Sequence, residues 1–239
     1  MRTYFTILFV ALLASGFTKL TSFPGTPATG NSNPGADTIT CQGYTLIINN
    51  LPSGFDTSTL RRLIDVFFEV YPRQVQRFNT QSAREVLLTI DPQYPGVAEA
   101  SGNKIRISSQ WLKNYPEDLD VITHEAMHIV QSYTHPVPGW LTEGIADYVR
   151  YAYGINNLKG NWLLPDFQPD QHYTNAYRIT ARFFIWLEKN VKAGLVDSLD
   201  KAARAGTYAP QLWTTLTGKT VDDLWQEYGR RPRLELSYR

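Results

Sequence analysis

The chain has 239 residues, of which 43% are hydrophobic and 19% charged, and its formal net charge at pH 7 is +1. This length can bury the core of one domain, and the composition is that of a globular protein rather than a disordered or membrane-embedded one. A charge so close to zero argues against nucleic acid or an anionic membrane as a partner. The single cysteine, Cys41, excludes an internal disulfide, and we expect a quiet, partly buried thiol there.

The N-terminus has the pattern of a secretory signal peptide. One early arginine is followed by an apolar run over residues 5–13 and then by small residues. This run is too short for an anchor and no stop-transfer pattern follows it. We therefore expect residues 1–20 to be removed and the mature protein to be secreted or periplasmic, without membrane association. Residues 21–42, rich in Pro, Gly, Thr and Asn, are expected to form a flexible linker before a single domain over 43–239.

The first part of this domain has strand patterns around one helical segment. β-branched or alternating runs predict strands at 44–50, 84–91 and in a hairpin over 96–109. Residues 56–78 have apolar side chains on one face, which is typical of a helix or a helix pair, and Asp56 or Thr57 can cap it.

From residue 117 onward the patterns are helical, apart from a long loop over 154–172. The predicted helices are 116–133, 139–153, 174–190, 192–205 and 220–228. Acidic residues at the start of the first of these fit the helix dipole, and Thr220 can cap the last. Strands first and helices later predict an α+β fold rather than alternating βαβ units.

The stretch VITHEAMHIV contains the strongest chemical signal. His124 and His128 are four residues apart, so a helix projects both imidazoles from one face, where they can hold one Zn²⁺ ion. Glu125 points to the side of that metal and can act as general base on its water. The alternative is an amphipathic surface helix with two solvated histidines.

A catalytic zinc ion needs a third protein ligand and one open position. A third histidine six residues after His128 is absent, because Thr134 stands there. The segment WLTEGIADYV instead supplies Glu143 as a ligand, and Asp147, one turn later, can accept the N–H of a metal-bound histidine. Close packing against the metal-bearing helix would explain the cost of Gly144 inside this helix. Alternatively, the two acids are ordinary surface residues.

The oxyanion of an amide hydrolysis needs a donor besides zinc. The candidates are His172, Tyr173, Tyr177 and Arg178. We favour Tyr177, although its helical spacing from Phe184 fits a core residue equally well.

Four segments, ITHEAMHIVQ, PGWLTEGIADYVR, YRITARFFIWLE and LTGKTVDDLWQEY, closely resemble the basic secretory protein family of plants and bacteria, a group of secreted zinc peptidases. The similarity extends over residues 43–230. It implies a zincin-like, gluzincin-type metallopeptidase fold with one zinc ion per chain, held by His124, His128 and Glu143, with Glu125 as catalytic base. It also supports Tyr177, which opens a family motif Tyr-x-x-Thr-Ala-Arg-Phe. The plant members are basic, so a role that depends on a strong positive field is not expected for this nearly neutral chain.

The resemblance to zincins also implies that the strand before the metal-bearing helix borders the substrate cleft. Residues 104–109 are expected to pair with the peptide, with isoleucines toward the core and polar groups outward; an ordinary sheet strand is the alternative. The expected substrate-binding residues are Ile105, Arg106 and Ile107. The loop 154–172, with Trp162 and Phe167, either forms a wall of the site or is a surface loop pinned by its aromatic residues.

The sequence thus favours an exported, monomeric, zinc-dependent endopeptidase that acts on peptide or protein substrates. One alternative is a non-catalytic binding protein with a zinc site, although a purely structural site would be closed by a fourth ligand. The other is a zinc amidase that acts on small or cell-wall peptides, and the sequence does not separate it from the endopeptidase.

Overall fold

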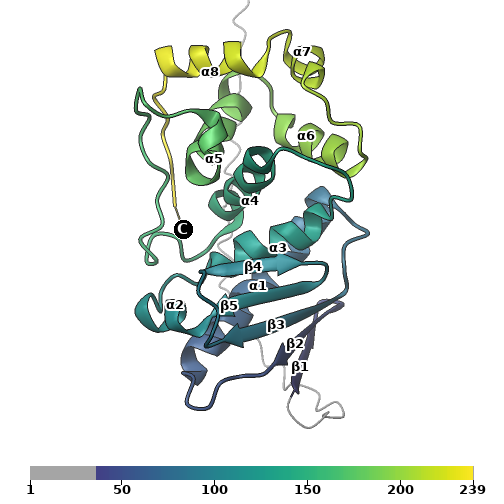
Figure 1. Cartoon of the computed structure of the whole chain (residues 1–239), viewed down its shortest axis with the longest axis vertical. Coiled ribbons are helices and arrows are strands. Elements are labelled where there is room, and N and C mark those ends of the chain that lie inside the picture. Colours follow the sequence, from purple (N-terminus) through teal and green to yellow (C-terminus); the bar gives the residue numbers. More distant parts are fainter. Residues whose placement is uncertain (1–35, 239) are drawn as a thin grey trace, which may run out of the picture.

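A computed structural model describes residues 36–238, so the expected signal peptide and residues 21–35 of the expected linker lie outside the described part. The fold is α+β: a mixed sheet with helix α1 lies at one end of the molecule, and helices α4 to α8 lie at the other (Figure 1). The strands are β1 (Ala36–Cys41), β2 (Tyr44–Asn49), β3 (Glu85–Asp91), β4 (Ala98–Ser101) and β5 (Lys104–Ser108). The helices are α1 (Thr57–Phe78), α2 (Ser109–Asn114), α3 (Val121–Gln131), α4 (Gly139–Tyr153), η1 (Tyr173–Asn175), α5 (Tyr177–Asn190), α6 (Leu195–Arg204), α7 (Gln211–Thr217) and α8 (Val221–Arg230).

Within the described residues the strands form one five-stranded sheet in the order β1-β2-β3-β5-β4. The three central strands are parallel, whereas β1 and β4 run antiparallel at the two edges. The predicted hairpin is confirmed, since Ser101 faces Lys104 and Gly102 takes a positive φ of 60° in the turn. Strand β4 therefore ends the sheet on the side of α3 (Figure 1).

Strand β1 corrects the expected linker over 21–42. Residues 36–41 pair with β2 along their whole length. The Pro and Gly residues that indicate a linker end at Gly35, and the β-branched Thr38, Ile39 and Thr40 that follow favour an extended strand. Cys41 is exposed rather than partly buried, because it stands at the last position of this edge strand.

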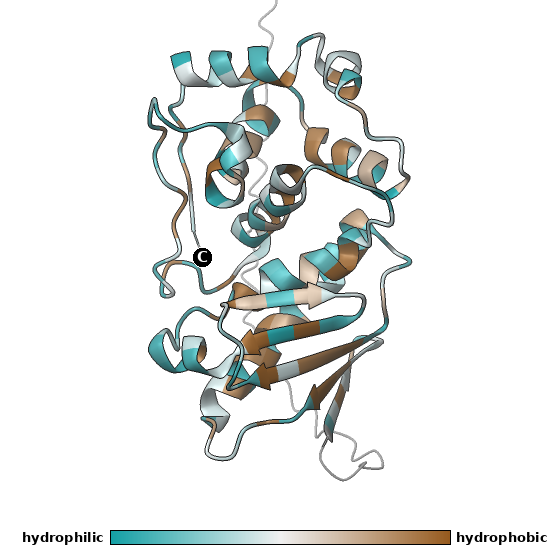
Figure 2. Ribbon diagram, in the orientation of Figure 1, coloured by the Kyte–Doolittle hydropathy of each residue, from teal (hydrophilic) through white to brown (hydrophobic). Residues whose placement is uncertain are grey.

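Helix α1 is a single helix that continues through Pro72 and packs its apolar face against the sheet. Asp56 caps it as predicted, because its carboxylate accepts the backbone N–H groups of Ser58 and Thr59. In Figure 2 the central strands are mostly brown, which marks hydrophobic residues. The largest fully buried side chains of these strands and α1 are Leu46, Leu63, Phe67, Tyr71, Leu88, Ile90, Ile105 and Ile107, and all belong to one core cluster.

The helices after residue 116 lie close to their predicted positions, with one informative difference. Helix α3 begins at Val121, so the acidic residues expected in its first turn precede it. Asp118 pairs with Arg150 instead, and Asp120 accepts the backbone N–H of Ile155 at 3.2 Å. Tertiary partners, which a local pattern does not contain, thus displace the helix start by about one turn. The short helices α2 and α7 were not predicted, whereas Thr220 caps α8 as expected.

None of the helices in residues 36–238 combines the length and apolar character that a membrane-spanning helix needs.

Candidate active site

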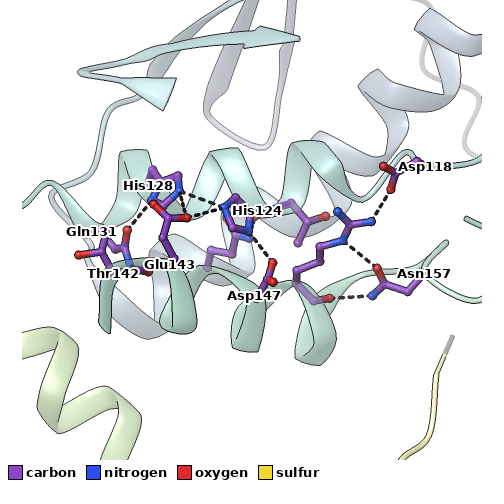
Figure 3. Close-up of polar contacts among 11 residues, drawn as sticks. Asp118, His124, His128, Gln131, Thr142, Glu143, Asp147 and Asn157 are labelled. Carbon is purple, nitrogen blue, oxygen red and sulfur yellow. Dashed lines mark hydrogen bonds and ion pairs between the residues drawn. The ribbon is translucent and has the colours of Figure 1, made fainter. Parts of the chain in front are cut away.

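Helices α3 and α4 lie antiparallel, and polar contacts join them turn by turn (Figure 3). At the C-terminal end of α3, the side-chain amide of Gln131 donates to the carbonyl of Thr142 at 2.9 Å. In the middle, Nδ1 of His124 lies 2.7 Å from Oδ1 of Asp147. Just before the N-terminus of α3, Asp118 pairs with Arg150 of α4. This row of contacts fixes which side chains of the two helices face each other.

Three predicted side chains converge along this row. Nε2 of His124 lies 3.1 Å from Nε2 of His128, and Oε2 of Glu143 lies 3.2 Å and 3.5 Å from these two nitrogens. A tetrahedral ion with bonds of 2.0–2.1 Å would separate its donor atoms by roughly 3.3 Å. The three donor atoms lie within 4.8 Å of one another, so they fit a single Zn²⁺ ion.

Both imidazoles are oriented by an acceptor on their other nitrogen. Asp147 accepts from Nδ1–H of His124, as predicted, and Oε1 of Gln131 lies 2.7 Å from Nδ1 of His128. In the neutral imidazoles, each Nε2 then has its lone pair toward the shared point. Gln131 was missed in the sequence, although its position three residues after His128 places it on the same helix face.

The cluster is short of positive charge, since it joins two imidazoles with three carboxylates. Burial disfavours a charge on His124, but Asp147 and Glu143 outweigh this effect and raise the pKa of the imidazole to about 10. Burial also opposes the charge of Glu143, yet its contacts with the two histidines lower its pKa to about 2. A bound cation would satisfy the same carboxylates more fully.

Glu125 lies beside the three converging side chains and is not one of them. Burial raises the pKa of its carboxyl group. Its Oε2 is buried and accepts no hydrogen bond from any described residue. A buried oxygen without a donor is costly in a folded protein, and at this position it suits a group that takes up a proton during a reaction.

A cleft contains this cluster. It runs along α3 between strand β4 on one side and α4 with the loop after it on the other. Residues that line it include Ala98, Glu99, Ala100, Trp111, Tyr115, Val121, Gln131, Ser132, Thr134, Thr142, Trp162, Tyr177 and Arg178.

The expected substrate strand is corrected. Strand β5 lies between β3 and β4, so its backbone is already paired on both sides. Ile105 and Ile107 are 1% and 0% exposed in the core, and Arg106 is paired with Glu99 on the opposite face of the sheet. None of these three lines the cleft, whereas β4 does. Which strand of the hairpin ends the sheet depends on tertiary pairing and not on the local pattern.

Tyr177 lies at the mouth of the cleft and is 54% exposed, so the core alternative does not hold. Its ring centroid lies 6.2 Å from that of His124, with the two rings nearly parallel. Glu143 and partial burial raise the pKa of its hydroxyl group. Among the other oxyanion candidates, Tyr173 is buried and donates to Asp222, and Arg178 lines the cleft while it donates to the carbonyl of Leu163. Nδ1 of His172 is hydrogen-bonded to Oγ1 of Thr174, and His172 does not line the cleft.

Gly144 is required by a different neighbour from the one expected. A Cβ atom at this position would lie 2.3 Å from Cγ2 of Thr180 and 3.2 Å from the ring of Phe184. Both residues belong to α5, so the glycine allows α4 to pack against α5 rather than against α3.

The two aromatic residues of the 154–172 loop have different roles. Trp162 lines the cleft, whereas Phe167 packs against Trp225 and Tyr228 of α8. The loop is thus pinned at one point and forms a wall of the cleft at the other.

Comparisons with known proteins identify the family and the fold. The family model described as "Peptidase of plants and bacteria" (BSP) matches residues 31–228, which confirms the resemblance to the basic secretory protein family. No curated protein matches the chain by sequence.

The chain is similar to several solved metallopeptidase structures. An M1 zinc metallopeptidase from Deinococcus radiodurans has a TM-score of 0.50 and 14% identity over 80% of this chain and 49% of that chain. A mutant of such an enzyme from the same organism, bound to a Tyr-Ser-Ala substrate, has a TM-score of 0.43 and 15% identity over 78% of this chain and 45% of that chain. An aminopeptidase N family protein from Idiomarina loihiensis has a TM-score of 0.40 and 17% identity, covering 82% of this chain and 41% of that chain. This chain spans about half the length of these relatives or less, and the likeness at 0.50 identifies the fold as zincin-like.

Proposed function

The chain belongs to this family of peptidases, and we propose that it is an exported zinc-dependent endopeptidase in which His124, His128 and Glu143 hold one Zn²⁺ ion. The observation that supports the proposal most is the convergence of two imidazole Nε2 atoms and one carboxylate oxygen, with Glu125 beside them. This donor set of two neutral imidazoles and one carboxylate is typical of catalytic rather than structural zinc, because it leaves a coordination position open.

The bound zinc ion would polarise the scissile carbonyl and lower the pKa of a coordinated water. Glu125 would take the proton of the attacking water and pass it to the leaving amine. The buried Oε2 of Glu125, which accepts no hydrogen bond from a described residue, is free to receive this proton. Asp147 and Gln131 keep the imidazoles in one orientation throughout.

Tyr177 would donate its O–H to the oxyanion that forms at the carbonyl carbon. Ala176 and Tyr177 both have a positive φ, of 64° and 50°, which non-glycine residues seldom adopt. This backbone conformation at the start of α5 holds the Tyr177 ring at the cleft instead of in the core. A strained backbone of this kind is often found at functional sites.

The free edge of β4 would bind the substrate backbone. An extended peptide can pair with an exposed strand through main-chain hydrogen bonds, and antiparallel pairing is slightly the more stable arrangement. The cleft continues past the cluster in both directions, from Val121 to Thr134 along α3 and its C-terminal extension. A cleft that can hold the substrate peptide on both sides of the cleaved bond is typical of an endopeptidase.

Export is supported by the N-terminal pattern alone, which lies outside the described residues. Mass determination of the mature N-terminus, in periplasmic and culture-supernatant fractions, tests it.

The decisive test of the activity compares the zinc-loaded wild type with Glu125→Gln on casein and on a peptide library. The wild type is expected to carry one zinc ion per chain and to cleave, while Glu125→Gln keeps the ion and loses activity about 100- to 10,000-fold. Glu69→Gln, at an exposed position on α1, is the matched control and should retain activity. A zinc-loaded wild type that cleaves none of these substrates would contradict the proposal and favour a binding protein; cleavage of small peptides alone would favour an amidase.

A further inference from the structure

One end of the cleft is aromatic. Trp111 and Tyr115, from α2 and its C-terminal cap, have ring centroids 4.3 Å apart, and Tyr115 is 52% exposed. Trp162, from the loop after α4, lines the same end. We call these three residues the aromatic end. Its position in the cleft is set by Asp118, which lies three residues before the start of α3 and contacts Trp111.

A buried ion pair holds both tryptophans. The indole N–H of Trp111 donates to Oδ2 of Asp118 at 2.8 Å, and the guanidinium of Arg150 lies 4.5 Å from the ring centroid of Trp162. Asp118 and Arg150 pair with each other, and both are buried. Asn157 holds Arg150 further, because it accepts from Nε and donates back to the Arg150 carbonyl (Figure 3 shows Asp118 and Asn157 in this row). The two indoles are thus held in fixed positions.

The charged groups behind the aromatic end are already paired. The carboxylate and the guanidinium neutralise each other, and the Trp111 indole N–H has its acceptor. A ligand therefore meets ring surface there rather than an unpaired charge. The opposite end of the cleft is lined by the polar residues Gln131, Ser132, Thr134 and Thr142.

The direction of strand β4 relates the aromatic end to the cleaved bond. The carbonyl of Val97, just before β4, accepts the N–H of Ser108, and Ser108 caps the helix that carries Trp111. The aromatic end therefore lies where β4 begins. A substrate strand antiparallel to β4 runs the opposite way, so its C-terminal part passes this point.

We infer that the aromatic end is a specificity subsite for a large apolar or aromatic substrate side chain on the C-terminal side of the cleaved bond. The inference rests on the proposed peptidase function. Rings of this kind bind apolar side chains through buried area and edge-to-face contacts, and they give no compensation to an acidic side chain for its lost water. Asp118 and Arg150 act as positioning residues, since they touch the tryptophans and not the substrate.

The test digests a peptide library with the zinc-loaded wild type, Trp162→Ala and Tyr115→Ala, and identifies each new N-terminus by mass spectrometry. The wild type is expected to release fragments that begin with, or carry within their first residues, Phe, Tyr, Trp, Leu or Met. Each variant should lower kcat/KM for these sites about 10- to 100-fold and leave sites with alanine there within about 3-fold. Trp162→Phe should restore most of the preference. Leu158→Ala, at an exposed loop position outside the cleft lining, is the control.

Peptide binding to the inactive Glu125→Gln protein, measured by calorimetry, separates this inference from the proposed function. Tighter binding of peptides with a large apolar residue, lost in the double variant with Tyr115→Ala, supports the subsite even where nothing is cleaved. Cleavage without any such preference, or a preference confined to the residue before the cleaved bond, would overturn the subsite and leave the peptidase standing. A preference that both alanine variants keep would also overturn it.

Discussion

Two groups of buried charges lie along the α3–α4 pair, and they differ in whether they are complete. Asp118 has its own cation in Arg150, and Trp111 and Asn157 form further hydrogen bonds with this pair. Toward the other end of α3, Glu125, Glu143 and Asp147 share two histidines. The first group is satisfied by the chain itself, whereas the second has more negative than positive charge.

This difference indicates where the chain needs a partner. A buried carboxylate without a cation is strongly unfavourable, so a fold keeps one only where something compensates it. The histidine group has ligand atoms at the spacing that a metal ion requires. The Asp118–Arg150 pair offers no ligand atom, because both carboxylate oxygens of Asp118 already have partners. The histidine group has the features of a reactive site, and the Asp118–Arg150 pair has those of a support for it. The predictions below separate the two groups.

The largest effect is expected for Glu143→Ala, which removes one of the three proposed ligands. Zinc content, measured by plasma mass spectrometry after dialysis, should fall from one ion per chain to nearly none, because two imidazoles on one helix do not complete a catalytic zinc site. Glu85→Ala, at an exposed strand position, is the matched control and should keep its ion. A full zinc content in Glu143→Ala would show that the ligand assignment is incorrect.

Arg150→Met should lower the free energy of unfolding and leave zinc binding unchanged. It leaves Asp118 buried without its cation, which costs about 3–5 kcal/mol in the free energy of unfolding, measured by urea denaturation. The control is Arg62→Met, which breaks the half-exposed pair with Glu117 and should cost about 1 kcal/mol or less. Equal costs for the two variants would mean that burial does not distinguish these pairs.

Asp147→Asn should weaken zinc binding about 10- to 100-fold without abolishing it, because the residue orients His124 and does not touch the metal. Competition with a chelator of known affinity measures the change. Asp118→Asn should leave zinc affinity unchanged, because Asp118 belongs to the other group of charges. If both substitutions weaken zinc binding equally, the two groups of charges form one coupled network.

Gly144→Ala should have the smallest effect, about 1–3 kcal/mol of destabilisation, since the new methyl group would overlap Thr180. Helix propensity alone predicts the opposite sign, a gain of about 1 kcal/mol. Gly139→Ala, in the same helix with no atom within 4 Å of the added Cβ, is the control and should be neutral or slightly stabilising. Thermal unfolding of both variants tests whether packing against α5, rather than the charged contacts with α3, stabilises α4 around Gly144.

The local patterns in the chain were sufficient for most of the elements. The helices predicted over 56–78, 139–153 and 174–190 correspond to α1, α4 and α5, and the hairpin over 96–109 was placed correctly. The errors occurred where a distant partner outweighs a local preference. Residues 36–41 became a strand because β2 pairs with them, and the start of α3 moved because Asp118 and Asp120 have tertiary partners.

The sequence by itself determined the chemistry of the candidate site, because a helix turns a spacing of four residues into a shared face. His124 and His128, and likewise Glu143 and Asp147, needed only this local geometry to be recognised. The tertiary structure alone decided that β4 and not β5 borders the cleft, that Gln131 orients His128, and that Arg150 and Asp118 join two tryptophans. These features depend on which elements become neighbours in space, and that is set by the packing of the whole chain rather than by any one segment.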